Sequence, residues 1–166
     1  MSDDILKIAF YKGDGLLRDR FIRRWTKSKY SHVELVIESK GWWLGIRPPD
    51  YPVVRKNIMH ICNDDDWDFI EIPVSKDEVD KIIQFYNKTS GMGYDWIGMI
   101  LSHVSRFKVK HTKRWYCSEW VIYALEHAGI FSGMLYDKNR LPPSDIYKLL
   151  LKYVHNSKNS MRYSAF

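Results

Sequence analysis

Residues 115–120 read Trp-Tyr-Cys-Ser-Glu-Trp and lead into a segment whose apolar side chains recur at helical spacing. Val121 and Leu125 lie four residues apart behind Cys117, and Gly129 provides a stop signal. The spacing therefore predicts a helix that begins at the cysteine. Free N–H groups and the positive end of the helix dipole stabilise a thiolate at that position. We expect Cys117 to be a nucleophile rather than the small core residue that most free cysteines are.

Residues 30–34 read Tyr-Ser-His-Val-Glu and open an apolar segment, His32 to Ile37, that is typical of a strand. Side chains two positions apart on a strand point to the same face, so His32 and Glu34 should share one. The imidazole of His32 could take the proton of a nearby thiol, and Glu34 could orient the imidazole or stabilise its cation. A surface glutamate on an edge strand would explain Glu34 equally well.

Further extended segments surround this strand. Trp42 to Ile46 is expected to pair with His32 to Ile37 as a hairpin, because residues 38–41 (Glu-Ser-Lys-Gly) supply turn chemistry. The proline-rich stretch 47–52 cannot be a central strand, since proline has no N–H to donate. The other strands are expected at Ile5–Tyr11, Val53–Ile61 and Trp67–Ile72.

Helical patterns alternate with these strands. Apolar residues within 16–25 recur at helical spacing, and we expect the apolar face of this short helix to pack on the sheet. Ser75 and Glu78 form a capping box for a helix over about Lys76 to Lys88. Further helices are expected at Tyr94–Val104 and at Ile146–Val154, the latter capped by Ser144 and followed by a polar tail from His155. The pattern predicts an α+β fold.

Length and composition favour one compact domain. The chain has 166 residues, close to the roughly 150 of a typical domain, and we expect one domain over residues 1–155 and a polar tail over 156–166. The N-terminus has no export signal and no apolar run approaches the roughly 20 residues of a membrane span, so we expect a cytoplasmic protein. Cys62 and Cys117 form no disulfide framework or zinc motif, and we expect no metal or cofactor.

The net charge of +6 comes largely from basic clusters at residues 18–29 and 106–114 and from the C-terminal tail. Such clusters could contact a membrane surface or another anionic polymer, although exposed Lys and Arg are also ordinary surface residues. Aromatic residues among the basic ones could stack on bases, but no nucleic-acid-binding motif is present. We expect no specific nucleic-acid partner.

The order of motifs resembles a known family. A Gly-Asp-Gly turn at 13–15 is followed by Arg-Trp-Thr-Lys-Ser-Lys-Tyr-Ser-His-Val at 24–33, Gly-Met-Gly-Tyr-Asp-Trp at 91–96, the cysteine motif at 115–120 and Leu-Pro-Pro-Ser-Asp at 141–145. Over roughly Ile5 to Leu150 the chain resembles the circularly permuted branch of the NlpC-type papain-like superfamily. That branch includes YiiX-like proteins and lecithin retinol acyltransferase-like enzymes.

The resemblance implies a small antiparallel sheet packed against helices, with the catalytic histidine before the cysteine. It places the nucleophile at Cys117 and the base at His32. The third, polar member of the family's site is often a glutamate on the next strand, which here reads Trp-Trp-Leu-Gly-Ile at 42–46 and offers none. Glu34 is our substitute for it, with Asp50 as a further candidate.

The resemblance implies a cysteine hydrolase of amide bonds that works through an acyl-enzyme. The N–H groups of Cys117 or Ser118 would hold the oxyanion. Peptidoglycan peptides are one expected substrate, and a phage-encoded enzyme that is released by lysis or carried in the virion would need no export signal. Two alternatives stay open: a lipid-directed thioesterase or acyltransferase, and a virion or binding module that has the fold but no turnover.

Overall fold

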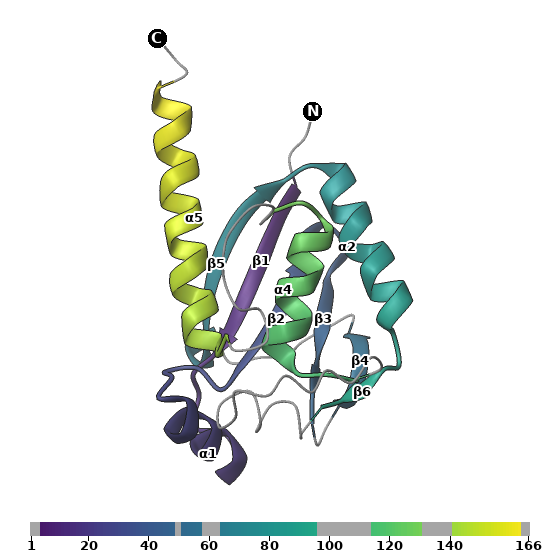
Figure 1. Ribbon diagram of the computed structural model, residues 1–166, viewed down its shortest axis with the longest axis vertical. Coiled ribbons are helices and arrows are strands. Elements are labelled where there is room, and N and C mark those ends of the chain that lie inside the picture. Colours follow the sequence, from purple (N-terminus) through teal and green to yellow (C-terminus); the bar gives the residue numbers. More distant parts are fainter. Residues whose placement is uncertain (1–3, 49–50, 58–63, 96–113, 131–140, 164–166) are drawn as a thin grey trace, which may run out of the picture.

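The computed structural model describes residues 4–48, 51–57, 64–95, 114–130 and 141–163. Seven strands form one sheet in the order β5-β1-β2-β3-β4-β6-β7 (Figure 1). Neighbouring strands are antiparallel except for the parallel pair β6 and β7. Their bounds are Asp4–Tyr11 (β1), His32–Ile37 (β2), Trp42–Arg47 (β3), Tyr51–Asn57 (β4), Trp67–Val74 (β5), Gly93–Tyr94 (β6) and Arg114–Trp115 (β7).

Four helices accompany the sheet in the described part of the chain: Leu17–Thr26 (α1), Lys76–Thr89 (α2), Cys117–His127 (α4) and Pro143–Tyr163 (α5). Helices α2, α4 and α5 share one hydrophobic core with one face of the sheet, whereas α1 lies at the end of the sheet (Figure 1). The fold is therefore α+β, as expected. None of the described helices is long and apolar enough to cross a membrane.

Local signals set several elements correctly. The hairpin of β2 and β3 is confirmed, with Leu35 opposite Leu44, and its turn closes at Gly41, whose φ of 61° favours glycine. The capping box of α2 is confirmed as well, because the Glu78 N–H donates to Ser75 Oγ at 3.3 Å and the Ser75 N–H donates to the Glu78 carboxylate at 2.7 Å. Helix α4 begins at Cys117, as the apolar spacing predicted.

Other boundaries were predicted wrongly. Strand β4 begins at Tyr51 and includes Pro52, two residues before the expected start. The register between β3 and β4 shifts between the pairs Arg47–Tyr51 and Gly45–Arg55, a stretch that contains Pro52, so the missing proline N–H interrupts no regular ladder. Tyr94 belongs to strand β6 rather than opening a helix, because it pairs with Trp115. Residues 96–104 of that expected helix lie outside the described residues, as do residues 58–61 of the expected fourth strand.

Helix α5 also differs from its prediction. It begins at Pro143, and the Pro142 carbonyl accepts the first N–H bonds, from Asp145 and Ile146, so Ser144 is not its cap. Proline suits a first helical position because it has no N–H to leave unpaired. The helix continues through His155 to Tyr163, well beyond the predicted end at Val154.

Helix α1 forms where predicted but faces the other way. Its large apolar side chains are exposed, with exposed fractions of 83% for Leu17, 57% for Phe21 and 46% for Trp25. The inner face instead carries polar anchors: Asp19 is buried, and Arg23 donates to the backbone carbonyls of residues 12 and 13. The expectation that the apolar face packs on the sheet is therefore wrong.

Candidate active site

His32 and Glu34 form a buried hydrogen-bonded pair on β2. His32 Nε2 lies 2.8 Å from Glu34 Oε1, and the exposed fractions of the two residues are 3% and 0%. Strand β2 lies between β1 and β3, so Glu34 is not on an edge strand. The interpretation of Glu34 as an exposed edge residue is wrong, and the prediction that the two side chains share a face is confirmed.

Arg55 also binds the Glu34 carboxylate. This arginine comes from β4, and its Nη2 lies 3.0 Å from Glu34 Oε1 while its Nη1 lies 3.3 Å from Oε2. Its guanidinium also stacks on the Tyr51 ring, 4.1 Å from the ring centroid. The carboxylate is thus fixed between a cation on one strand and an imidazole on its own strand, which leaves it little rotational freedom.

Gly45 makes the space that Glu34 occupies. A Cβ at this β3 position would lie 2.9 Å from Glu34 Cγ, closer than carbon atoms normally approach. Strand β3 therefore provides, at Gly45, the space that the Glu34 side chain fills. Sequence reasoning missed this relation, although a glycine between large apolar residues in a strand is a sign of close approach.

The charges of this network fix its protonation. Burial alone would raise the pKa of Glu34, but hydrogen bonding and attraction from His32 and Arg55 outweigh it and hold the pKa at about 2. Burial lowers the pKa of His32 despite the attraction of Glu34, and Arg47 and Arg55 lower it further. Because the Arg55 guanidinium lies against its carboxylate, Glu34 is ionised even when His32 is neutral. A neutral His32 then donates its Nε2–H to Glu34 and keeps a lone pair on Nδ1.

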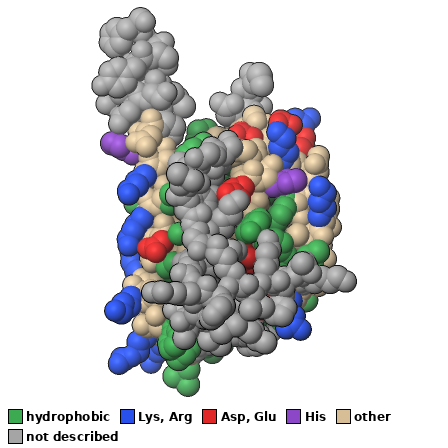
Figure 2. All heavy atoms as spheres, viewed as in Figure 1, with side chains coloured by type: hydrophobic (Ala, Val, Ile, Leu, Met, Phe, Trp, Pro, Cys, Tyr) green, Lys and Arg blue, Asp and Glu red, His purple; other side chains and the backbone are tan. Residues whose placement is uncertain are grey.

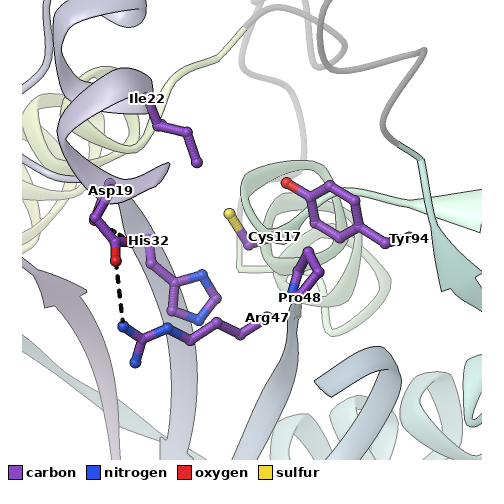
Figure 3. Close-up of a pocket in the computed structure, with 8 residues that line it drawn as sticks. Asp19, Ile22, His32, Arg47, Pro48, Tyr94 and Cys117 are labelled. Carbon is purple, nitrogen blue, oxygen red and sulfur yellow. Dashed lines mark hydrogen bonds and ion pairs between the residues drawn. The ribbon is translucent and has the colours of Figure 1, made fainter. Parts of the chain in front are cut away.

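Cys117 lies on the opposite wall of the same cleft as His32 (Figure 3). It is a free thiol on the first residue of α4 and is 7% exposed. The thiol interacts with the backbone of Val33 and of Ser118. Helix α4 packs over β2, so a thiol at its first residue meets the cleft of His32.

The pKa of Cys117 does not move in the predicted direction. Burial raises the pKa of the thiol to about 11, and the nearby Glu34 charge adds to this, against backbone hydrogen bonds that lower it. The helix N-terminus was expected to lower the pKa, but desolvation of the thiolate is the larger effect here. Cys117 and His32 therefore rest as a neutral thiol and a neutral imidazole.

The cleft between them is narrow. Its free space is about 10 Å³, close to the minimum that holds one ordered water molecule. Its walls come from α1, β2, β3, β6 and α4, and its lining residues are Asp19, Ile22, Ser31, His32, Arg47, Pro48, Tyr94 and Cys117. A second space, of about 20 Å³, also borders Cys117 and is lined by Tyr116, Ser118, Pro142 and Pro143 among others. Both spaces are bordered by α1.

Arg47 places a positive charge in the cleft, which sequence reasoning did not foresee. Its guanidinium lies 4.4 Å from the centroid of the Tyr11 ring and 3.9 Å from Asp19, the pair that is dashed in Figure 3. Its Nε is buried and has no hydrogen-bond partner among the described residues. This N–H lies beside Cys117 and His32 and could donate a hydrogen bond to an oxygen atom of a bound substrate.

Two residues named in the sequence analysis lie outside the described residues. They are Asp50, the further candidate for the third polar residue, and Cys62. The described residues contain no group of three or more His, Cys, Asp or Glu side chains that could hold a metal ion.

Comparison of the sequence with models of protein families and with curated proteins finds no match. The geometry of the cleft is therefore what supports a function for this protein.

Proposed function

We propose that this protein is a cysteine hydrolase with a permuted papain-like fold that works through an acyl-enzyme. The observation that carries the proposal is the buried hydrogen bond between His32 and Glu34 in the cleft that Cys117 also lines. A nucleophile, a base and a group that orients the base are the three parts of such a site. The cysteine at the start of a helix and the histidine on a central strand agree with the family resemblance.

The protonation states define the first half of the reaction. Because the resting thiol is neutral, its proton moves to Nδ1 of His32 as the sulfur attacks the carbonyl carbon of the substrate. The resulting imidazolium is stabilised by the ionised Glu34 that accepts its Nε2–H. The carbonyl oxygen becomes an oxyanion, which the N–H groups of Cys117 and Ser118 at the helix N-terminus would hold.

The second half restores the enzyme. His32 gives the Nδ1 proton to the leaving amine or alkoxide, the bond to the leaving group breaks, and the acyl group stays on the sulfur. A water molecule then attacks the thioester while Nδ1 takes its proton, and the acid product leaves with the thiol reprotonated. An acyltransferase or thioesterase would use the same steps, with an acceptor alcohol or amine in place of water or with a thioester as substrate.

The proposal is tested by turnover with matched variants. The purified protein is assayed with peptidoglycan fragments, peptide amides and acyl esters, together with Cys117→Ala and His32→Ala. Cys62→Ala is the matched control, because it removes the other cysteine of the chain. We expect the control to keep the wild-type rate and the two site variants to lose it. Equal rates for wild type and Cys117→Ala would refute the proposal and favour an inert module of the same fold.

A further inference from the structure

Helix α1 presents a continuous apolar stripe to solvent. Leu17, Phe21 and Trp25 recur every four residues, so they lie on one face, and Leu16 extends the stripe with 55% of its surface exposed. The rings of Phe21 and Trp25 stack at 5.8 Å with an interplanar angle of 20°. In Figure 2 hydrophobic side chains gather at the lower end of the molecule, where α1 lies in Figure 1.

Exposed cations flank this stripe. Arg20, Arg24 and Lys27 are exposed, and they alternate with the apolar residues along the outer side of the helix. The opposite side is anchored: Asp19 accepts hydrogen bonds from Ser31 Oγ at 3.1 Å and from the Leu16 N–H at 3.0 Å. The bond to Ser31, together with those of Arg23 to the carbonyls of residues 12 and 13, ties this side of the helix to the protein, so the apolar stripe faces solvent.

We propose that α1 is a docking helix for an anionic lipid surface. An apolar face bordered by Arg and Lys is the pattern of helices that lie in the interface of a bilayer, where the rings enter the acyl boundary and the cations meet anionic headgroups. The choice of lipid over a protein groove follows from charge complementarity, because a cationic border favours a surface with many negative charges. The net charge of +6 acts in the same direction.

Docking through α1 would bring the cleft of Cys117 close to the lipid surface. Ile22, on the inner side of the helix, lines both spaces beside Cys117. A helix is roughly 10 Å across, so a bound α1 would hold the cleft about one helix diameter from the lipid surface. The inference goes beyond the proposed hydrolase activity, and the binding itself does not require a reactive Cys117.

The test is sedimentation of the full-length protein with vesicles of phosphatidylcholine alone and of phosphatidylcholine mixed with phosphatidylglycerol. We expect binding to the anionic vesicles only, and weaker binding as salt is raised. The double variant Phe21→Ser with Trp25→Ser should lower the partition coefficient about tenfold or more. Arg20→Gln with Arg24→Gln should lower it about fivefold per charge.

Matched controls come from other surfaces of the chain. Leu151→Ser removes an apolar side chain that is 47% exposed on α5, and Lys76→Gln with Lys88→Gln removes two exposed charges on α2. Both should bind like wild type, as should Cys117→Ala, which separates this inference from the proposed activity. Equal binding to both vesicle types, or no binding, would overturn the proposal. A dimer that the Phe21 and Trp25 substitutions dissociate, without vesicle binding, would assign the stripe to a second copy of the chain.

Discussion

Gly45→Ala should damage the site without touching any of its reacting groups. The added Cβ would lie 2.9 Å from Glu34 Cγ, about 0.6 Å short of an ordinary carbon contact of about 3.5 Å. Glu34 has no exposed surface and is held at 2.8 Å by His32 and at 3.0 Å by Arg55, so it has nowhere to move freely. A shift of about 0.6 Å would lengthen or bend these hydrogen bonds toward the limit of useful geometry.

Two measurements follow from this geometry. Urea unfolding should show a loss of about 1–3 kcal/mol, which is usual for an overpacked core. Ester hydrolysis should fall about tenfold to a hundredfold, because the base loses its orientation. Gly93→Ala is the matched control: it also lies in a strand, but an added Cβ there meets no atom within 4 Å. We expect it to change stability by less than about 0.5 kcal/mol.

A double-mutant cycle separates this mechanism from general damage. If Gly45 acts by making room for Glu34, the activity cost of Gly45→Ala should largely disappear in a Glu34→Ala background. An undiminished cost in that background would show that Gly45 acts through something other than Glu34. Wild-type stability and activity in the single variant would refute the geometric reasoning outright.

Three further outcomes follow from the charges of the site. The pKa of Glu34 is lowered from 4.5 to about 2, so its ionisation adds about 3 kcal/mol of stability above pH 4.5, which is lost as the pH falls toward 2. Glu34→Gln should remove this pH dependence of the unfolding free energy in acid. An unchanged pH dependence would contradict the assignment. Arg55→Met leaves a buried carboxylate without its cation and should lower the free energy of unfolding in urea by about 3–5 kcal/mol. The double variant Arg55→Met with Glu34→Gln should lose less stability than the two single variants lose in sum. Losses that simply add would argue against the ion pair. Because the thiol pKa is about 11, iodoacetamide should alkylate Cys117 at pH 7 about a hundredfold more slowly than a free thiol with a pKa of 9.0. The alkylation rate should keep rising above pH 9. Rapid alkylation at pH 6 would instead indicate a preformed ion pair of thiolate and imidazolium.

The parts of the fold that were predictable are those governed by neighbouring residues. The hairpin turn at Gly41, the capping box of α2 and the start of α4 each depend on residues within a few positions of one another. The errors arise where distant segments decide. Tyr94 is extended because it pairs with Trp115, and α1 turns its apolar face outward because Asp19 and Arg23 are anchored inside.

The site divides along the same line. That His32 and Glu34 share a face follows from strand periodicity, and that Cys117 opens a helix follows from apolar spacing. Arg55 joins the pair through tertiary contact between β2 and β4, which no local pattern contains. The direction of the Cys117 pKa shift depends on burial, and burial comes from the packing of several elements around the cleft. Helix-end electrostatics was visible in the sequence, but the larger desolvation effect was not.

Trapping of the acyl-enzyme would identify the nucleophile of this protein. The protein is mixed with an activated acyl ester, quenched in acid and analysed by intact mass and peptide mapping. We expect one acyl group on Cys117 in wild type, none in Cys117→Ala, and much slower acylation in His32→Ala. An acyl group on another residue, or ester hydrolysis by Cys117→Ala at the wild-type rate, would contradict the assignment of Cys117 as the nucleophile.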